Sequence, residues 1–282
     1  MYSNAGSTSI SASTISGNTA TSGGGGLYLS GGATISGATI SSNSAVSGGG
    51  LMTDIQTVSI SGSSFMSNTA TGGGGGLASY GPTSITGTTF SGNKAVTNGG
   101  GLDNERGTAA LTNVTLSGNS ASTNGGGLYN VSTALLKNVT VSDNSALSGG
   151  ALYMSSGFTT VLTNTILAFS HSGGNCSGTA TSSKYSFSSD NTCALPGTIK
   201  GLSPNGLDPL LSALGNYGGP TLVHMLRVGS PALDGVVGND APLTDQRGLP
   251  RPQGGGYDIG AVERQPGETG LLPRLYLPLI VR

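Results

Sequence analysis

Charged and aromatic residues are scarce in this chain of 282 residues. Only 8% of the residues are charged and 5% are aromatic, tryptophan is absent, and the formal net charge is -1. Because affinity for phosphates comes mostly from Lys and Arg, this balance argues against a nucleic-acid binder. Disorder requires high net charge and few apolar residues, whereas 35% of this chain is hydrophobic. The composition therefore favours a repetitive β architecture over a disordered chain.

The sequence also lacks a long apolar run and a recognisable targeting segment. Its longest apolar stretch, Leu275 to Val281, is interrupted by Pro278 and is shorter than the roughly 20 residues that span a bilayer. Met1 to Asn4 have neither the basic region nor the apolar core of a signal peptide. We therefore predict no transmembrane segment, and secretion has to be inferred from other features.

Only two cysteines occur, Cys176 and Cys193, in a stretch rich in Gly, Ser and Thr. Their spacing matches neither a zinc ribbon nor a CxxC redox pair. We expect a disulfide between them, with two unpaired buried thiols as the alternative. Because disulfides persist in oxidising compartments, this expectation places the protein outside the cell or on its surface.

What the sequence does contain is a repeat of about 25 residues. Each unit has an Asn, an Ala two positions later, a Gly-rich run and then a Leu. Further apolar residues stand three and eight positions before each Asn. The Asn column comprises Asn18, Asn43, Asn68, Asn93, Asn119 and Asn144.

A unit with three short apolar segments, each bounded by Gly or Asn, predicts one rung of an all-β, right-handed parallel β-helix. Helical repeats are excluded because no apolar stripe with a period of 3.6 residues is present. Asn at a corner tolerates left-handed backbone, and stacked Asn side chains form amide ladders. We therefore expect the Asn column to be architectural, and the recurring Ala to fill a tight interior corner.

The repeat ends near residue 172, where the composition changes. Every proline except Pro82 lies at or after Pro196, and charged residues become more frequent. We predict regular β-helix repeats over residues 1–172, irregular rungs and a cap over 173–263, and a tail over 264–282. Solenoids need such an atypical end to close their core.

Two groups of motifs resemble families of bacterial surface proteins. Phe65-Met66-Ser67-Asn68 and Phe90-Ser91-Gly92-Asn93 are similar to the FxxN motif of polymorphic outer membrane protein repeats, and Gly149-Gly150-Ala151-Leu152 is similar to their GGA(I/L/V) motif. Residues 173–263 resemble the choice-of-anchor Q domain in four motifs, which are Asn216-Tyr217-Gly218-Gly219-Pro220-Thr221, Gly229-Ser230-Pro231-Ala232-Leu233-Asp234, Thr244-Asp245-Gln246-Arg247-Gly248 and Asp258-Ile259-Gly260-Ala261-Val262-Glu263. The resemblance implies a bacterial surface or secreted β-helix protein, and neither family supplies catalytic residues.

Residues that suit catalysis are few. Asp103, Glu105 and Arg106 share one rung and Asp143 stands at a turn, and we expect all four to be solvated loop residues. A denser set, expected to form a salt-bridged cap that closes the helix end, comprises Asp234, Asp240, Asp245, Arg247, Arg251, Asp258 and Glu263. His171 and His224 have no acidic or Cys partner at ligand spacing. We therefore predict no metal, no cofactor and no enzymatic activity.

Small hydroxyl residues form two columns that we expect to face outward. One lies seven residues before the Asn position, is interrupted by Lys137, and comprises Ser11, Ser36, Ser61, Thr86, Thr112 and Thr163. The other lies four residues before each Asn and comprises Thr14, Thr39, Ser64, Thr89, Thr115 and Thr140. Such columns suit an exposed sheet, and they also suit binding to glycans or ice. Asn113 and Asn138 each begin a sequence that matches a glycosylation sequon.

The tail ends in an apolar segment whose residues on both strand faces are Leu275, Tyr276, Leu277, Leu279, Ile280 and Val281. Pro273 and Pro278 suit an edge strand that pairs on one side only. Met1 falls in the Leu column, so we expect an unpaired edge at the first rung, which natural β proteins avoid. Either the chain is a fragment of a longer protein, or residues 271–282 contact a neighbouring subunit near residues 1–35, a head-to-tail contact that builds filaments.

Together these features predict an extracellular structural β-solenoid that serves as a surface adhesin or as a filament subunit assembled by end-to-end contacts. The alternatives are a carbohydrate-active β-helix enzyme and a glycan- or ice-binding module. The expected partners are further copies of the chain and surface glycans, without nucleic acid.

Overall fold

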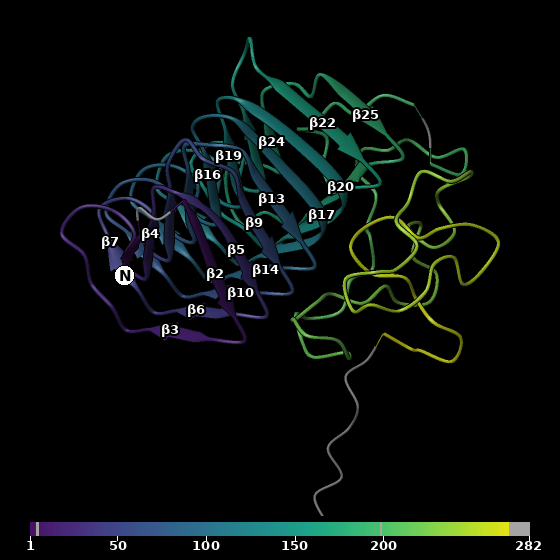
Figure 1. The fold of residues 1–282 in the computed structure, drawn as a ribbon. Coiled ribbons are helices and arrows are strands. Elements are labelled where there is room, and N and C mark those ends of the chain that lie inside the picture. Colours follow the sequence, from purple (N-terminus) through teal and green to yellow (C-terminus); the bar gives the residue numbers. More distant parts are fainter. Residues whose placement is uncertain (4–5, 198, 271–282) are drawn as a thin grey trace, which may run out of the picture.

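The computed structural model describes residues 1–3, 6–197 and 199–270, which wind into a coil of stacked strands (Figure 1). All strand pairs are parallel, and paired residues of successive turns, such as Ile35 and Ile60, are about 25 residues apart. The prediction of an all-β, right-handed parallel β-helix is confirmed. Within the described ranges there is no α-helix, and so none that is long and apolar enough to cross a membrane.

The strands form three sheets that run along the coil. The eight-stranded sheet contains β1 (Tyr2–Ser3), β4 (Leu27–Leu29), β8 (Leu51–Thr53), β12 (Leu77–Ser79), β16 (Leu102–Asn104), β19 (Leu128–Asn130), β21 (Leu152–Met154) and β24 (Cys176–Ser177). The four-stranded sheet contains β7 (Ser44–Ala45), β11 (Thr69–Ala70), β15 (Lys94–Ala95) and β18 (Ser120–Ala121).

The fourteen-stranded sheet has two arms that two long strands join. One arm contains β2 (Ser7–Ser11), β5 (Gly32–Ser36), β9 (Val58–Ser61), β13 (Thr83–Thr86), β22 (Thr159–Thr163) and β25 (Ser182–Lys184). The other arm contains β3 (Thr14–Ser16), β6 (Thr39–Ser41), β10 (Ser64–Met66), β14 (Thr89–Ser91), β23 (Ile166–Ala168) and β26 (Phe187–Ser188). The strands that run through both arms are β17 (Thr108–Ser117) and β20 (Thr133–Ser142).

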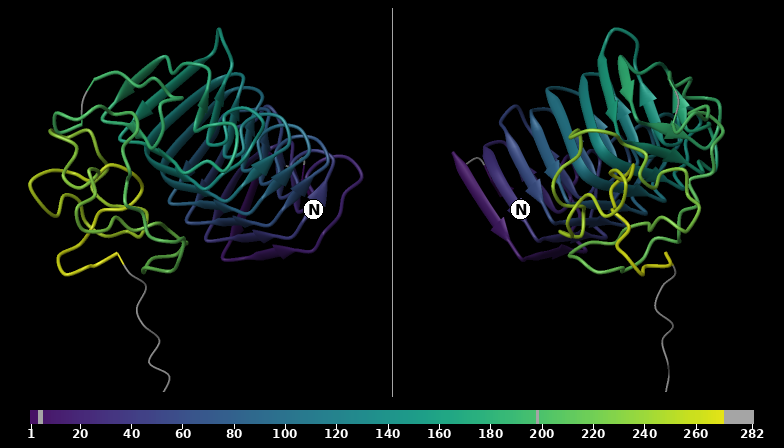
Figure 2. Two further views of the ribbon diagram at one scale, coloured as in Figure 1. Left: turned by 180° about the vertical axis from the view of Figure 1, so that it is seen from behind. Right: turned by 90° about the vertical axis from the view of Figure 1, so that its right-hand side faces the viewer.

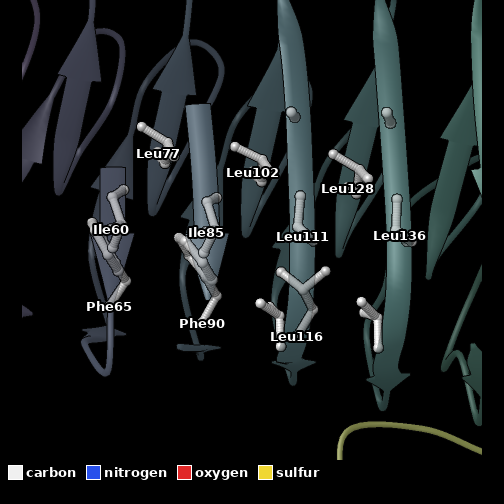
Figure 3. Close-up of a cluster of buried hydrophobic side chains, with 14 of the residues drawn as sticks. Ile60, Phe65, Leu77, Ile85, Phe90, Leu102, Leu111, Leu116, Leu128 and Leu136 are labelled. Atoms are coloured by element: carbon white, nitrogen blue, oxygen red, sulfur yellow. The ribbon is translucent and has the colours of Figure 1, made fainter. Parts of the chain in front are cut away.

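Equivalent apolar residues of successive rungs stack inside the coil. Phe65 pairs with Phe90, and their rings stack with centroids 4.6 Å apart. Buried apolar side chains each stabilise the fold by about 1.5–3 kcal/mol, so register slips that break these rows are costly. Figure 3 shows the rows Leu77, Leu102, Leu128 and Ile60, Ile85, Leu111, Leu136.

The Ala column forms a short strand of its own in each of four rungs. In β11, Thr69 is exposed whereas Ala70 is fully buried, and the same alternation holds for Lys94 and Ala95 in β15. The Ala methyl group therefore points inward at a corner that leaves little room. The corner residues Ala95, Ala121 and Ala146 pack on one another.

The Gly-rich runs pass close to the neighbouring turn. A β-carbon on Gly76 would lie 2.6 Å from the carbonyl oxygen of Gly101 and 2.9 Å from Cδ1 of Phe90. Gly74 has a φ of 71°, which L side chains rarely adopt. Close approach and left-handed backbone both require glycine here, so the runs belong to the architecture.

One shorter rung, from β24 to β26, follows the regular ones. Leu162 of β22 pairs with Ser183 of β25, a step of 21 residues. The loop residues 189–197 and 199–207 then pack onto this rung, where the Ser188 amide donates to the Pro204 carbonyl oxygen at 2.8 Å. Cys193 and Leu195 in this loop are buried with the main core, so they close this end of the coil.

Residues 208–270, here called the C-terminal segment, return along the side of the coil (Figures 1 and 2). Within these residues pairing is limited to isolated bridges. The segment meets rungs far back in the sequence: Thr89 Oγ1 donates to the Leu222 carbonyl at 2.6 Å, and the Ala261 amide donates to Thr140 Oγ1 at 3.0 Å. We call the covered side, residues 87–89, 113–117, 138–143 and 164, the docking flank.

Candidate functional site

The Asn column forms an unbroken ladder of side-chain amides. Asn43 Nδ2 donates to Asn68 Oδ1 at 3.0 Å, and Asn68 Nδ2 donates to Asn93 Oδ1 at 2.9 Å. The same bond links Asn18 to Asn43 and continues through Asn119 to Asn144. From Asn43 onward each side chain also donates to a backbone carbonyl of the preceding rung, as Asn68 does to Ile40 at 2.9 Å. Every amide group therefore holds two rungs together and is not available for chemistry.

The left-handed residue at this corner is not the Asn itself. It is the residue before each Asn, among them Ser42, Ser67 and Asp143 with φ of 55°, 54° and 60°. We expected the Asn itself to adopt left-handed backbone at the corner. This expectation is wrong, because the preceding residue adopts it. The role of the Asn is to satisfy the backbone groups that the tight turn exposes.

The ladder ends beyond Asn144 because Ser170 takes the next position. Asn175, five residues later, supplies the missing amide: its Oδ1 accepts from the Ser170 amide at 3.1 Å and its Nδ2 donates to the Leu167 carbonyl at 2.9 Å. Sequence reasoning missed this residue because it lies outside the repeat spacing. The backbone N–H of Asn175 in turn donates to Asp190 Oδ2 at 2.8 Å.

Cys176 and Cys193 form a disulfide at the same end of the coil, with their Cα atoms 4.7 Å apart. Cys176 begins β24, and Cys193 lies in the loop that closes the core. The bond therefore ties the end loop to the last rung. The proposed contact residues Leu275, Tyr276, Leu277, Leu279, Ile280 and Val281 lie outside the described residues.

Four residues of the charged set in the C-terminal segment form buried ion pairs. Arg247 Nε is 2.9 Å from Asp245 Oδ2, and Arg251 is 2.9 Å from Glu263 Oε2, with both arginine side chains fully buried. Glu268 completes the pairing of Arg247 at 2.6 Å. These pairs do not close the helix end as the sequence suggested, because the segment that contains them lies along the side of the coil. Lys184 and Asp240 form a separate exposed pair.

Asp258 is a buried carboxyl group of this set. Burial and the neighbouring Glu263 raise its pKa to about 7, and hydrogen bonds from the amides of Arg264 and Asp234 only partly offset them. Both of its oxygens are occupied: Oδ1 accepts from Asp234 at 2.7 Å and Oδ2 from Arg264 at 2.7 Å. The group thus fixes the fold of the segment instead of facing a substrate.

Gln246 of the C-terminal segment contacts two rungs of the docking flank. Its Nε2 donates to Thr89 Oγ1 at 2.8 Å, and its Oε1 accepts from Thr115 Oγ1 at 2.7 Å. The hydroxyl column four residues before each Asn was expected to face solvent, but Thr89, Thr115 and Thr140 are buried beneath the segment. The expectation is wrong for these three rungs because the segment supplies partners for their hydroxyl groups.

A second turn column holds the flank as well. Residues six positions before each ladder Asn, and before Ser170 in the next rung, have positive φ. They are Ala12 in the first rung, glycine in the next three, and Asn113, Asn138 and Asn164 in the last three. These side chains donate to the C-terminal segment: Asn113 to the Thr244 carbonyl at 2.9 Å and Asn138 to the Gly260 carbonyl at 3.1 Å. The Asn residues of both sequons are therefore buried contacts in the fold.

His224 also docks on the flank. Its Nδ1 lies 2.8 Å from the Ser212 carbonyl and its Nε2 lies 2.9 Å from Ser117 Oγ. Because a carbonyl only accepts, Nδ1 bears the proton in the neutral ring and Nε2 accepts from the serine. Burial lowers the pKa of His224, against a smaller opposing effect of the Ser212 contact and Asp143. A serine and an imidazole pair also in nucleophilic catalysis, but Ser117 is only 4% exposed, so substrate does not reach it.

The carboxyl groups of Asp143 and Asp103, both on regular rungs, differ in their exposure to solvent. Asp143 accepts from Ser142 Oγ at 2.9 Å and is partly exposed. Asp103, expected to be solvated, is buried at 3% exposure, and burial together with Glu105 raises the pKa of its carboxyl well above the usual range. In the part of the chain that the structure describes, no three His, Cys, Asp or Glu side chains gather as a metal cluster.

Comparison with known proteins gives one match. A family model described as a right handed beta helix region matches residues 1–166, which end where β23 begins. No curated protein and no solved structure matches the chain.

Proposed function

Because the chain belongs to the right-handed β-helix family, we propose that it is an extracellular structural solenoid, a surface adhesin or a subunit of a filament. The observation that supports this proposal is that carboxylates of the C-terminal segment are held in buried ion pairs with arginine. Glycosidases place two carboxylates on either side of the scissile bond. Here Asp245 and Glu263 are buried and paired with Arg247 and Arg251.

The extracellular location is supported by two features. The Cys176–Cys193 disulfide suits an oxidising compartment. The motifs that resemble polymorphic outer membrane protein repeats and the choice-of-anchor Q domain belong to bacterial surface proteins. Native material digested without reductant should contain Cys176 and Cys193 in one cross-linked peptide by mass spectrometry, and two free thiols there would remove this support.

Substitution of Glu263 separates the structural protein from the enzyme. In Glu263→Gln the buried Arg251 loses its charge partner, so we expect lower stability and faster proteolysis of the C-terminal segment. Asp208→Asn is a matched control, because Asp208 is an exposed carboxylate of the same segment. A folded Glu263→Gln protein that has lost a glycan-cleaving activity of the parent would instead establish the enzyme.

Filament assembly through residues 271–282 is part of the proposal. An apolar strand that adds to a neighbouring subunit makes a heterologous contact, and such contacts build fibres when they do not close. Electron microscopy of native material should show fibres, and deletion of residues 271–282 should leave folded monomers. Fibres that persist unchanged after the deletion would contradict this contact.

A binding module is the second candidate, and one surface favours it. Ser9, Thr34, Ser59 and Ser84 are exposed on the outer face of β2, β5, β9 and β13, where they form a regular row of hydroxyl groups. Such a row offers hydrogen bonds to glycans or to ice. Binding to a glycan array, or inhibition of ice recrystallisation, that Ser59→Tyr abolishes would favour this function over a purely structural one.

A further inference from the structure

A groove opens where the margin of the C-terminal segment meets β10. It has a volume of about 310 Å³, with Ser64 and Met66 in one wall and Asn216 and residues 219–222 in the other. Both residues of the first wall are half-buried outward residues of β10. The second wall is fixed to the docking flank, because Thr89 Oγ1 donates to a carbonyl within it at 2.6 Å. The groove therefore continues the interface between the segment and the coil toward the earlier rungs.

Met66 interrupts a column of serines on the outer side of the coil. It pairs in register with Ser41 of β6 and Ser91 of β14. The same column also contains Ser16, Ser117 and Ser142. Methionine is apolar and flexible, so it adapts to the shape of a partner. The one apolar side chain among these six thus lines the groove, where Pro220 and Leu222 add further apolar surface.

The described part of the chain ends beside a second hollow that adjoins this groove. The second hollow has a volume of about 280 Å³ and is lined by residues 216–218, Met225 and residues 267–270. Asn216 lines both hollows, so they meet at this side chain. At the end of the described chain, a β-carbon on Gly270 would lie 2.9 Å from the Leu226 carbonyl oxygen. The chain therefore leaves the C-terminal segment close to the groove.

Residues 271–282 follow directly, and their chemistry matches the groove. Apart from two arginines and two prolines, they are leucine, tyrosine, isoleucine and valine. An extended chain advances about 3.3 Å per residue, so these residues reach about 40 Å. Met66 lies two rungs, or about 10 Å along the coil, from Ser117, where His224 docks. Residues 271–282 are therefore long enough to cross the groove, and burial of their apolar side chains there is favourable.

We propose that residues 271–282 dock in the groove of their own chain, with their apolar side chains against Met66 and Leu222. A contact within one chain has a high effective concentration, so at low protein concentration it is favoured over the same contact with a separate molecule. This contact goes beyond the proposed structural function. One consequence rests on that function: residues 271–282 must leave the groove before they add to a neighbouring subunit of a filament.

Brief digestion of the full chain with trypsin tests the contact at Arg274. Proteolysis follows the population of the open form, so docking should slow cleavage after Arg274 about tenfold or more relative to a synthetic peptide of residues 271–282. Met66→Ser installs the residue that the neighbouring rungs have, and it should raise the cleavage rate about tenfold. Mass spectrometry of the released residues 275–282 measures the rate. Leu279→Asp leaves the coil unchanged and should act in the same direction, so it remains informative if Met66→Ser fails to fold.

Met52→Ser is the matched control, because Met52 is a half-buried outward methionine of β8 in another sheet. It should leave the cleavage rate unchanged. The proposal is overturned if the parent is cleaved as fast as the peptide, if Met66→Ser and Met52→Ser behave alike, or if protection increases with protein concentration. The last result would assign residues 271–282 to a neighbouring subunit, whereas docking within the chain gives the same rate at every concentration. Electron microscopy of native material tests the filament separately, so the two proposals can fail independently.

Discussion

Asparagine at the corner of each rung does what no other small polar residue does there. Its amide has both a donor and an acceptor, so one side chain continues the ladder and also meets the backbone of the preceding rung. Asn68 uses both, and its Oδ1 also accepts from the backbone N–H of Asn43 at 3.0 Å. A serine offers too short a side chain, and the ladder stops where Ser170 replaces Asn.

Asn68→Ala should therefore be strongly destabilising. It leaves the Ile40 carbonyl, the Asn43 amide groups and Asn93 Oδ1 buried without these partners, and each unsatisfied group costs about 1–3 kcal/mol. We expect a loss of about 3 kcal/mol or more in the free energy of unfolding, measured with urea. Asn124→Ala, which removes a single partly buried bond to Asn98, should cost less than about 1 kcal/mol. Equal losses in the two variants would contradict an architectural ladder.

At the scale of the strand, the corner strands β7, β11, β15 and β18 are short because only a methyl group fits inside. Ala95 lies between Ala70 and Ala121 in register, and these residues are buried. The strands β2, β5, β9 and β13 differ from these corner strands, because their outward Ser and Thr side chains face solvent. The two faces of each strand thus tolerate different changes.

Ala95→Leu should overpack the corner and lower the free energy of unfolding by about 1–3 kcal/mol. Ser61→Ala, on the exposed face of β9, should change it little. Chemical denaturation of both variants beside the parent provides the measurement. An Ala95→Leu protein that unfolds with the parent would show that the side chain has room, and so that the corner is not interior.

At the scale of the whole molecule, the C-terminal segment binds to rungs that lie far back in the sequence. The turn residues Asn113, Asn138 and Asn164 join left-handed backbone with a side chain that reaches the segment. Glycine suffices at the equivalent turns Gly37 and Gly62, in rungs that come before the docking flank.

Asn138→Gly should keep the turn and loosen the segment. Glycine adopts the required φ of 53° without strain but loses the bonds to Gly260 and from Asn164. We expect docking to weaken by about 1–3 kcal/mol, seen as faster proteolysis within residues 208–270. Ala12→Gly, at the same turn of the first rung, should not accelerate that proteolysis. If both variants behave alike, the side-chain contacts of Asn138 do not hold the segment.

Docking should also depend on pH through His224. Burial lowers its folded-state pKa below the ordinary value of 6.5, so the folded protein favours the neutral ring. The stability that this preference supplies is present above pH 6.5 and is lost as the pH falls below it. Asp258 acts in the opposite direction, because its raised pKa makes its contribution decline as the pH rises through about 7.

The comparison of variants isolates the histidine. Between pH 7.5 and 5, the parent should lose more stability than His224→Gln, whereas His171→Gln should follow the parent because His171 is exposed. Differential scanning fluorimetry across this range measures the effect. Identical pH profiles for the parent and His224→Gln would rule out a contribution from the imidazole.

The repeat alone determined the coil, its period, its strand positions and the columns that face its interior. The physical reason is that a 25-residue unit buries its apolar residues only by stacking on a copy of itself, so identical residues must lie over one another. That logic applies within each pair of adjacent rungs, where sequence spacing is also spatial spacing.

Only the tertiary structure decided which of the outward residues meet solvent. Thr14 and Thr115 occupy the same column, yet Thr14 is exposed and Thr115 is buried against Gln246, 131 residues away. The enclosure of Asp103 likewise follows from the glycine runs of two rungs and not from its own neighbours in sequence. A periodic pattern records which face a side chain points to, whereas the return path of the C-terminal segment depends on contacts that no period encodes.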